Sequence, residues 1–479
     1  MKLNTKIKKI ISDKYTPVSL YLLLRDHYQN PVLLESSDYS SRAGHFSYIC
    51  LAPLAEITLK NDTIKKRNGQ HEFSVKVESG KEILEHLNVF YNSFQYNHFT
   101  HDFYYAGIVG FMGYDAIPYF EEVSFTKRKE FDMPELYYAV YSLYLVFDHQ
   151  TDSLFLISHG QSDTECDALI SEVEEKIASG KTADYPFSLI KNETVNFSDE
   201  EFKNLLEVAK SHIQAGDVFQ IVLSKRFSVQ FKGDEFNVYR ALRNLNPSPY
   251  LFYFDLGNYK LFGSSPEAQL VMDKNTAEIH PIAGTYRRTG NDSEDAIQAK
   301  KLAIDEKEKS EHMMLVDLAR NDLSKYCTGV NVKSLAQIQF YSHVIHIVSK
   351  VSGHVKQGSN PFQVLTGTFP AGTLSGAPKH RAMQLINSYE NVARQFYGGC
   401  IGFISHCGKV NHAIMIRTFL SQNYKLYYQA GAGIVINSEP ESENNEIYNK
   451  TGALKKAIHQ AEKFNNITKD INHEIISVG

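Results

Sequence analysis

The 479-residue sequence contains no tryptophan and only five cysteines. The cysteines are scattered and form no Cys-x-x-Cys motif, which excludes the usual zinc and dithiol redox patterns. Long apolar runs are missing too: no stretch approaches the ~20 apolar residues of a membrane span, and none of signal-peptide length follows the basic N-terminus. An odd number of scattered cysteines is typical of reduced thiols, so we expect a cytoplasmic protein.

A large excess of one charge is also absent. The formal net charge is -5 and no strongly basic face is evident, so neither nucleic acid nor an anionic membrane is expected as a general partner. Hydrophobic residues make up 43% of the chain and charged residues 22%. These values are typical of a globular protein, and the length allows two or three domains.

The usual nucleotide and metal motifs are lacking. Gly372 and Gly376 of GTLSGAPK lie four residues apart with no Gly-Lys-Ser/Thr, so this is not a P-loop. QAGAGIVI lacks the third glycine of a dinucleotide fingerprint. Neither an EF-hand loop nor the Glu-x-x-His of a di-iron bundle is present. No Cys-His or Ser-His-Asp arrangement follows from the spacing.

What the sequence does contain is a predicted helix with a pair of glutamates on its apolar side. The helix is predicted over residues 307–322. Glu308 and Glu311 share one stripe with Leu315, Leu318 and the preceding Ile304. Taken alone, such a pair is more often a solvated acidic turn with i, i+4 ion pairs.

A second predicted helix repeats the arrangement. In residues 442–461, Glu443, Glu446 and Lys450 share a stripe with Leu454. Neighbouring carboxylates repel by roughly 3 kcal/mol at an effective dielectric near 20, so a buried quartet needs a cation. Oxygen-only ligands suit Mg²⁺, which takes one or two carboxylates plus water or substrate oxygens. The repetition on a second apolar stripe therefore favours a magnesium site.

The order of the patterns predicts an α+β fold, a layered β-sandwich of mostly antiparallel sheets flanked by helices. Residues 17–180 are mostly strand-like, with helices near 81–93 and 164–178. Ser198 and Glu201 form a capping box that begins the next helix. A long helical region is expected from Asp292 through the first acidic helix.

A polar, aperiodic stretch over 179–195 indicates a domain boundary. We therefore expect an N-terminal domain at 1–190, a catalytic domain at 196–465 and a C-terminal tail at 466–479.

Single residues leave alternatives open. Arg417, predicted in a strand, Lys450 and Lys379 could contact carboxylates or be surface charges. His346 lies in an alternating strand, where a lone histidine is more often a hydrogen-bonded core group than a catalyst. Cys400 is interpreted as a packing residue.

Ordered motifs across residues 198–462 resemble the chorismate-utilising enzymes and, within that family, the large subunits of anthranilate synthases. The matching motifs are GSSPE (263–267), PIAGT (281–285), EHMMLVDLARND, HVIHIVSKV, GTLSGAPKHRAMQLI, YGGCIGF and QAGAGIVINSEPESENNEIYNK. LLES (33–36) and GIVGFMGYDAIPYF extend the resemblance toward the N-terminus. It implies a Mg²⁺-dependent lyase that converts chorismate and ammonia to anthranilate and pyruvate, the first committed step of tryptophan biosynthesis.

Two positions separate the members of this family. Gln220 stands where isochorismate and salicylate synthases carry a lysine that activates water, and Ala283 stands where aminodeoxychorismate synthases typically have lysine. Ammonia is already a nucleophile and needs neither base. The runner-up is aminodeoxychorismate synthase component I, and the rival of another class is a silent Mg²⁺-binding or regulatory subunit.

The resemblance also implies a role for each matched residue. Glu311 and Glu446 would be the Mg²⁺ ligands, with Glu308 and Glu443 nearby. The residues that would bind the ring carboxylate of the substrate are Lys450, Gly284, Thr285, Gly431 and Gly433. At the reacting ring, Glu267 would be the general acid, and His346, Thr373 and Gln220 would lie beside it. Tyr397 and Arg417 would hold the enolpyruvyl carboxylate.

Regulation and partners follow from the same resemblance. The resemblance implies a regulatory pocket for tryptophan, to which residues 246–251 contribute. It places four residues in that pocket: Ser36, Pro249, Tyr250 and Leu251. None of the five cysteines sits in the glycine-flanked turn of a glutaminase nucleophile. We therefore expect a separate glutamine amidotransferase subunit to supply ammonia, in a hetero-oligomer such as a heterotetramer.

Overall fold

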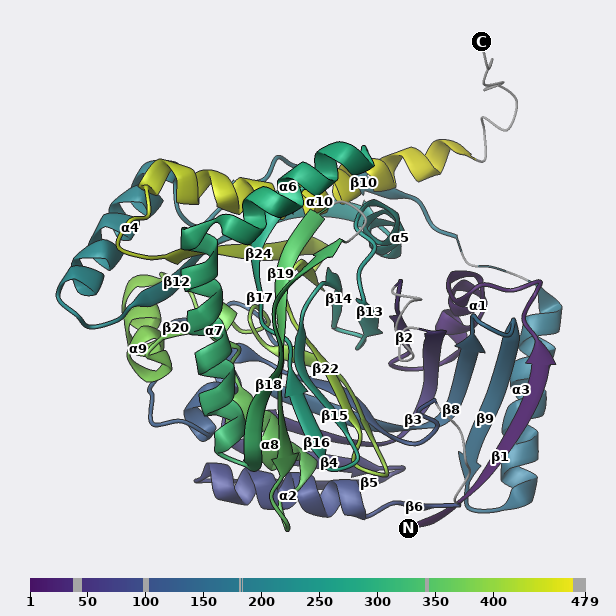
Figure 1. Cartoon of the computed structure of the whole chain (residues 1–479). Helices are drawn as coiled ribbons and strands as arrows, with labels where there is room; N and C mark the ends of the chain where they lie inside the picture. Colours follow the sequence, from purple (N-terminus) through teal and green to yellow (C-terminus); the bar gives the residue numbers. More distant parts are fainter. Residues whose placement is uncertain (38–44, 98–102, 181, 183, 341–343, 468–479) are drawn as a thin grey trace.

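The computed structural model describes residues 1–37, 45–97, 103–180, 182, 184–340 and 344–467 (Figure 1). The elements up to the expected domain boundary are β1 (Lys2–Ile11), α1 (Pro17–Leu24), η1 (Arg25–His27), β2 (Val32–Glu35), β3 (Phe46–Lys60), β4 (Thr63–Asn68), β5 (His71–Lys76), α2 (Gly80–Asn92), β6 (Gln95–Tyr96), β7 (Gly107–Met112), η3 (Tyr114–Tyr119), β8 (Leu136–Asp148), β9 (Ser153–Gly160), α3 (Asp163–Ser179), β10 (Phe187–Leu189) and β11 (Thr194–Val195).

The remaining elements are α4 (Asp199–Gln214), β12 (Gln220–Gly233), α5 (Phe236–Leu245), β13 (Tyr250–Asp255), β14 (Tyr259–Ser265), β15 (Ala268–Asp273), β16 (Thr276–Ile279), β17 (Ile282–Arg287), α6 (Asp292–Ile304), α7 (Glu306–Ser324), β18 (Cys327–Phe340), β19 (Val344–Val355), α8 (Pro361–Thr368), η4 (Gly372–Leu374), β20 (Gly376–Ala377), α9 (Lys379–Tyr389), β21 (Cys400–Ser405), β22 (Val410–Ile414), β23 (Thr418–Gln422), β24 (Lys425–Ile434) and α10 (Pro440–Ile467).

Two antiparallel sheets share the long strands β3 and β8. The first runs β12-β24-β23-β14-β13-β2-β3-β8-β9-β1. The second runs β18-β19-β16-β15-β22-β21-β7-β8-β3-β4-β5, and β17 also pairs with β19. This arrangement confirms the predicted α+β fold with antiparallel sheets.

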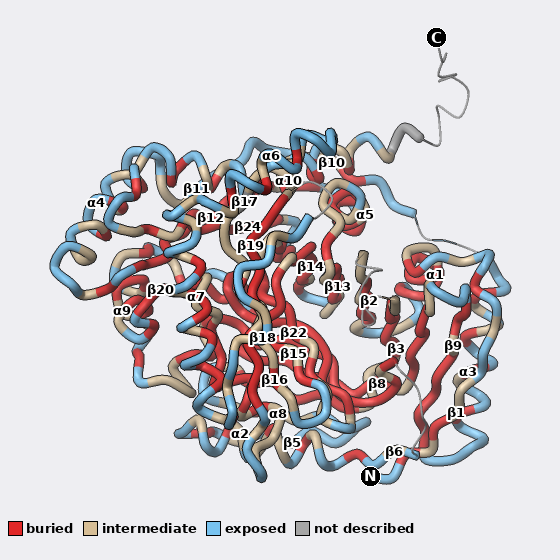
Figure 2. Tube along the Cα trace, viewed as in Figure 1, coloured by how far each residue is buried: buried red, intermediate tan, exposed pale blue. Residues whose placement is uncertain are grey.

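Alternation along the strands builds the layers. On β13, Phe252 and Phe254 join a buried cluster that also holds Phe111 and Phe403 of the second sheet. Tyr253, between them, faces the opposite way and packs among helix residues. The inner faces of the two sheets therefore make one aromatic core, and the outer faces are left for helices, as the buried centre of Figure 2 shows.

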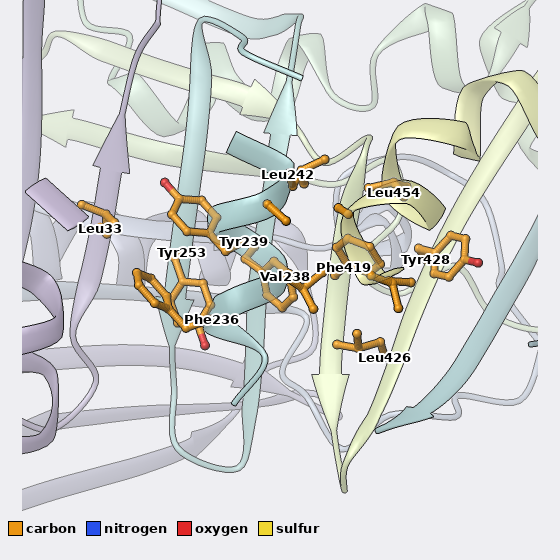
Figure 3. Close-up of a cluster of buried hydrophobic side chains, with 14 of the residues drawn as sticks. Leu33, Phe236, Val238, Tyr239, Leu242, Tyr253, Phe419, Leu426, Tyr428 and Leu454 are labelled. Atoms are coloured by element: carbon orange, nitrogen blue, oxygen red, sulfur yellow. The ribbon is translucent and has the colours of Figure 1, made fainter. Parts of the chain in front are cut away.

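Helices cover both outer faces. The first sheet is covered by α5 and α10, where Tyr239 and Leu454 pack against Phe419 and Tyr428 (Figure 3). The second sheet is covered by α2, α7 and α8, through residues that include Leu87, Val316 and Leu365. Both acidic helices thus lie against sheets, which fixes the direction of their glutamates.

Several local predictions are confirmed. The Ser198 side chain accepts a hydrogen bond from Glu201 N while the Glu201 side chain accepts one from Ser198 N, so the capping box is formed. Helices α2 and α3 lie at the two expected places. Cys400 is fully buried in β21.

Two local predictions were wrong. Residues 17–24 form α1 and not a strand, because Thr16 and Ser19 make a reciprocal cap and Pro17 suits the first turn. The long helical region from Asp292 is present as two helices: Asp305 ends α6, and its side chain caps α7 by accepting from Glu308 N. The place of Ile304 on the glutamate stripe was wrong. Ile304 is 72% exposed and does not belong to the glutamate stripe.

The strands pair across the expected domain boundary. β2 pairs with β13, and β7 pairs with β21. Residues from both expected domains therefore contribute to both sheets. Of the expected tail 466–479, residues 468–479 lie outside the described residues. No helix in the described ranges is long and apolar enough to cross a membrane.

Candidate active site

The paired glutamates of α7 and α10 occupy one electrostatic environment. Burial raises the pKa of Glu308, and the neighbouring charges of Glu311 and Glu446 raise it further. Burial likewise raises the pKa of Glu311, with a further contribution from Glu446. Burial raises the pKa of Glu443 to about 6. The two helices are far apart in sequence, and the fold brings Glu308 and Glu311 within repulsion of Glu446, which in turn acts on Glu443.

Two lysines oppose this negative charge, Lys307 of α7 and Lys450 of α10. Lys450 Nζ lies 2.6 Å from a Glu446 carboxylate oxygen and donates to the Gly431 carbonyl oxygen at 2.8 Å. Burial alone would raise the pKa of Glu446, but Lys450 outweighs it and lowers the pKa. Lys450 is thereby placed between the acidic pair of α10 and the glycines of β24.

The donor set fits a hard cation bound jointly by protein and substrate. In the described part of the chain, no three His, Cys, Asp or Glu side chains form a group that could hold a metal ion unaided. Mg²⁺ does not require one, since it binds through one or two carboxylates and completes its shell with water and substrate oxygens. Carboxylates that raise one another's pKa are destabilised by like charge, which a divalent cation relieves.

Gln220 and Gly433 close one side of the acidic cluster. Gln220 Nε2 donates to Glu311 Oε1 at 2.9 Å. A Cβ added at Gly433 would lie 2.7 Å from that nitrogen, so any larger residue would displace the carboxamide. The glycine in QAGAGIVI is therefore explained by close approach and not by nucleotide binding.

Gly284 and His346 form the opposite wall. Gly284 has φ +62°, and an added Cβ would lie 3.2 Å from Glu308 Oε2 and 2.8 Å from Leu302 Cδ1. Its carbonyl oxygen accepts a hydrogen bond from His346 Nδ1 at 2.8 Å. Burial lowers the pKa of His346 to about 4, so the ring is neutral with Nδ1 protonated. Thr285 pairs with His346 in the register of β17 and β19.

Glu267 is a buried carboxyl suited to hold a proton. It lies between β14 and β15, is 8% exposed, and Thr373 Oγ1 lies 3.3 and 3.4 Å from its two oxygens. Burial raises the pKa of Glu267 to about 8, although Thr373, Lys450 and Arg417 act to lower it. The group is therefore protonated at neutral pH, as a general acid must be.

Arg417 and Tyr397 lie on the side of β23 and β24. Arg417 is not inside a strand as predicted: it is the residue before β23, with φ +48°, and its carbonyl oxygen accepts from Ser264 N at 3.1 Å. Burial lowers the pKa of Arg417, and Glu267 opposes that shift. Tyr397 is buried, with its hydroxyl against Gly431, where an added Cβ would come within 2.8 Å.

A separate cavity collects the four residues expected to bind tryptophan. Ser36, Pro249, Tyr250 and Leu251 line one cavity of about 480 Å³. The pairing of β2 with β13, which sets Leu251 opposite Glu35, brings the LLES motif beside this segment. Aromatic side chains of Tyr48, Tyr104 and Phe403 line it as well.

Lys379 contacts a buried carboxylate of α7. Its Nζ lies 2.6 Å from Asp322 Oδ2, and both side chains are buried.

Sequence reasoning missed a second buried ion pair, Glu390 with Arg394. Arg394 donates to the Leu374 carbonyl oxygen at 2.6 Å and lies over the Tyr397 ring. It supports Thr373 and Tyr397 at once, and its i, i+4 spacing from Glu390 was the available signal.

Comparison with known proteins defines the class. The sequence profile of the chorismate binding enzyme family matches residues 31–456. The chain belongs to this family.

Named relatives narrow the assignment. The chain is 37% identical to anthranilate synthase component 1 of Aquifex aeolicus over 95% of its own length and 94% of that protein. It is 38% identical to anthranilate synthase component 1 of Bacillus subtilis over 93% of its length and 90% of that protein.

Solved structures agree. Anthranilate synthase component I from Streptococcus pneumoniae superposes with a TM-score of 0.78 at 30% identity, covering 93% of this chain and 99% of that one. The menaquinone-specific isochorismate synthase from Escherichia coli superposes with a TM-score of 0.72 at 18% identity, over 95% and 94% of the two chains, and shares the fold.

Proposed function

We propose that this chain is the chorismate-using component of an anthranilate synthase, which converts chorismate and ammonia to anthranilate and pyruvate. The observation that carries the proposal is the position of Glu267, a protonated buried carboxyl near Arg417 and Lys450, in a chain related over 95% of its length to an anthranilate synthase component. The resemblance in the ordered motifs points the same way.

The charges of the site suit a substrate with two carboxylates. Lys450 and the backbone N–H groups near Gly284, Thr285, Gly431 and Gly433 would bind the ring carboxylate. Arg417 and Tyr397 would hold the enolpyruvyl carboxylate at the other end. Anchoring both ends fixes the ring, and this orientation is itself a large part of catalysis.

The same arrangement fits Mg²⁺. Glu311 and Glu446 would hold the ion, with Glu308 and Glu443 beside it. When bound, the ion supplies positive charge to the ring carboxylate and polarises the conjugated system. Repulsion within the cluster, seen in the raised pKa values of Glu308, Glu311 and Glu443, supports a cation at this position.

Protons are moved by Glu267. It donates its proton to the C4 hydroxyl, which leaves as water while ammonia attacks C2 and the ring double bonds shift. His346 and Thr373 line the reacting ring. The neutral His346 carries no charge that would oppose the later loss of the enolpyruvyl group as pyruvate.

Regulation and assembly complete the proposal. The 480 Å³ cavity at Ser36 and Tyr250 would bind tryptophan as a feedback inhibitor. Ammonia would come from a glutamine amidotransferase subunit in a hetero-oligomer. The five unpaired cysteines support a reducing, cytoplasmic location.

The test is a direct assay of the purified chain. Chorismate, MgCl₂ and ammonium chloride at alkaline pH should yield anthranilate, detected by its fluorescence, with one pyruvate for each anthranilate. Accumulation of an amino-chorismate without pyruvate would show an aminodeoxychorismate synthase instead. No turnover under any of these conditions would favour a silent regulatory subunit.

A further inference from the structure

Gln269 is a buried glutamine of β15 that has no part in the site described above. Its side chain is 2% exposed, and Nε2 donates to the Thr368 carbonyl oxygen, at the end of α8, at 2.9 Å. Oε1 is also buried but has no hydrogen-bond partner among the described residues. Buried acceptors are nearly always satisfied, so this oxygen indicates a donor that the chain itself does not supply.

Turning the carboxamide over would not satisfy this oxygen. A flipped amide would set Oε1 against the Thr368 carbonyl oxygen, which places two acceptors together. The backbone also limits the side chain, because β15 carries one extra residue between Ala268 and Leu270 in its pairing with β22. Such a bulge re-aims a side chain and is common beside active sites. The direction of Oε1 is therefore set by the fold.

Gln269 lines a small cavity beside the proposed proton donor. The cavity has a volume of about 30 Å³, and Glu267, Thr373 and Asp322 line it as well. The rest of its wall is largely apolar and includes Leu315. A volume of this size holds about one or two water molecules, and water is stable there only where polar atoms bind it. The cavity offers such atoms at Gln269 and at the carboxyl of Glu267.

The charged groups around Glu267 are accounted for. Asp322 of α7, the second carboxylate of the cavity, pairs with Lys379 of α9 at 2.6 Å. Lys450 of α10 and Arg417, before β23, act to lower the pKa of Glu267, but burial outweighs them and raises it to about 8. Because the carboxylates cannot donate when ionised and no described side chain bonds Oε1, the missing partner of Oε1 is a neutral donor.

We propose that this cavity holds a water that donates one O–H to Gln269 Oε1 and the other to the Glu267 carboxyl, which makes Gln269 a positioning residue for the proton donor. The catalytic consequence rests on the proposed function. With one O–H fixed by Gln269, the second is directed at the carboxyl on which negative charge develops as Glu267 gives up its proton. Neither the water nor the glutamine gains or loses a proton, and both act through hydrogen bonding alone.

A crystal structure tests the site without an activity assay. In the parent without substrate, at a resolution that shows ordered water, we expect a water within hydrogen-bonding distance of Gln269 Oε1 and the Glu267 carboxyl. Gln269→Met keeps the length of the side chain and removes the amide, so this water should be lost. Ala319→Val leaves Gln269 unchanged but adds volume to the cavity wall, and it should exclude the water too. A parent cavity without water would overturn the inference.

The catalytic consequence is measured as the pH dependence of kcat at a fixed concentration of dissolved NH₃. A water that donates to the carboxylate stabilises the ionised form of Glu267 and lowers its pKa. Loss of the water in Gln269→Met or Ala319→Val should therefore move the alkaline limb to higher pH by about one unit. The plateau kcat should fall by about fivefold. KM for chorismate and half-saturation by Mg²⁺ should stay within about twofold of the parent.

Gln422→Met is the matched control. Gln422 is another buried glutamine, at the end of β23, and both ends of its amide bond the backbone of Asp132. Its replacement should lower the unfolding temperature and leave the alkaline limb in place. An unmoved limb in Gln269→Met, or an equal shift in Gln422→Met, would overturn the inference. Failure of the parent to form anthranilate while the water is present would instead reject the proposed function.

Discussion

The two polar sites of this molecule are built in opposite ways. Between α7 and α10, carboxylates face one another, and Lys307 and Lys450 oppose them. In the cavity beside β2 and β13, the lining charges are already paired, Glu35 with Arg243 at 2.9 Å and Lys350 with Glu278 at 2.6 Å, and hydroxyl, amide and aromatic groups make up much of the wall. The first site is completed by added positive charge, while the second offers shape and hydrogen bonds to a neutral or zwitterionic ligand. Changes of charge should therefore damage the first and changes of volume the second.

The largest effect is expected from removing one metal-binding carboxylate. Glu311→Gln or Glu446→Gln should lower anthranilate formation by about 10³-fold or more, because a metal ion contributes several kcal/mol to such a reaction. Without Mg²⁺, Glu311→Gln should unfold at the same temperature as the parent or higher, since like charge is removed. Glu446→Gln also loses the ion pair with Lys450 and should unfold at the same temperature or slightly lower. Glu441→Gln is the matched control, because Glu441 is on α10 but forms only an exposed pair with Lys203. Near-normal turnover of the parent in EDTA would contradict this account.

The second effect concerns the proton donor. Glu267→Gln should lower kcat by about 10²- to 10⁴-fold without changing half-saturation by Mg²⁺. Glu267 acts when protonated, and with a pKa of about 8 it is protonated below and ionised above that pH. At a fixed concentration of dissolved NH₃, kcat of the parent should thus fall as pH rises through about 8. A rate that keeps rising to pH 10 at fixed NH₃ would remove Glu267 from this role.

The volume of the side chains should matter in the cavity at Ser36 and Tyr250. Ser36→Phe should weaken tryptophan inhibition by about tenfold or more, because an aromatic ring would fill part of the 480 Å³ cavity. Activity without tryptophan should stay within about twofold of the parent. Ser36→Ala, which adds no volume, should keep most of the inhibition. Equal inhibition of Ser36→Phe and the parent would place the inhibitor elsewhere.

A smaller effect tests the neighbour of the proton donor. Thr373 lowers the pKa of Glu267 by hydrogen bonding, against the larger effect of burial. Thr373→Val keeps the shape and removes the hydroxyl, so the alkaline limb of kcat at fixed NH₃ should move to higher pH. A limb that moves to lower pH would show that the hydroxyl stabilises the protonated acid instead.

The sequence predicted features that depend on spacing within a single helix. The glutamate pairs follow from helical spacing, and the capping box of α4 from Ser198 and Glu201, because both depend on residues close in the chain. The division of the predicted helical region at Asp305 has no clear local signal, because an aspartate cap inside a long helical pattern resembles an ordinary surface residue. Arg417 was placed in a strand because a positive φ at arginine leaves no local signal.

Contacts between distant segments were beyond such reasoning. The ion pair of Lys379 with Asp322 joins residues 57 positions apart, and neither local pattern indicates the other. The unpartnered Oε1 of Gln269 depends on the approach of α8 to β15. The family resemblance supplied candidate residues for the site, but their hydrogen-bond partners and burial come only from the fold.

The smallest expected effect concerns the cysteines. Burial raises the pKa of Cys50, Cys166, Cys327 and Cys400, which makes each a poor nucleophile. Cys407 is exposed, and its sulfur lies 3.1 Å from Ser405 Oγ, a hydroxyl that cannot act as the base a glutaminase thiol needs. Cys407→Ser should therefore leave ammonia-dependent activity within about twofold of the parent, and the purified parent should form no anthranilate from glutamine. Adding an amidotransferase subunit should restore glutamine-dependent synthesis equally to both proteins. Glutamine-dependent activity in the isolated chain that disappears in Cys407→Ser would show that this thiol hydrolyses glutamine, and the requirement for a partner would fall.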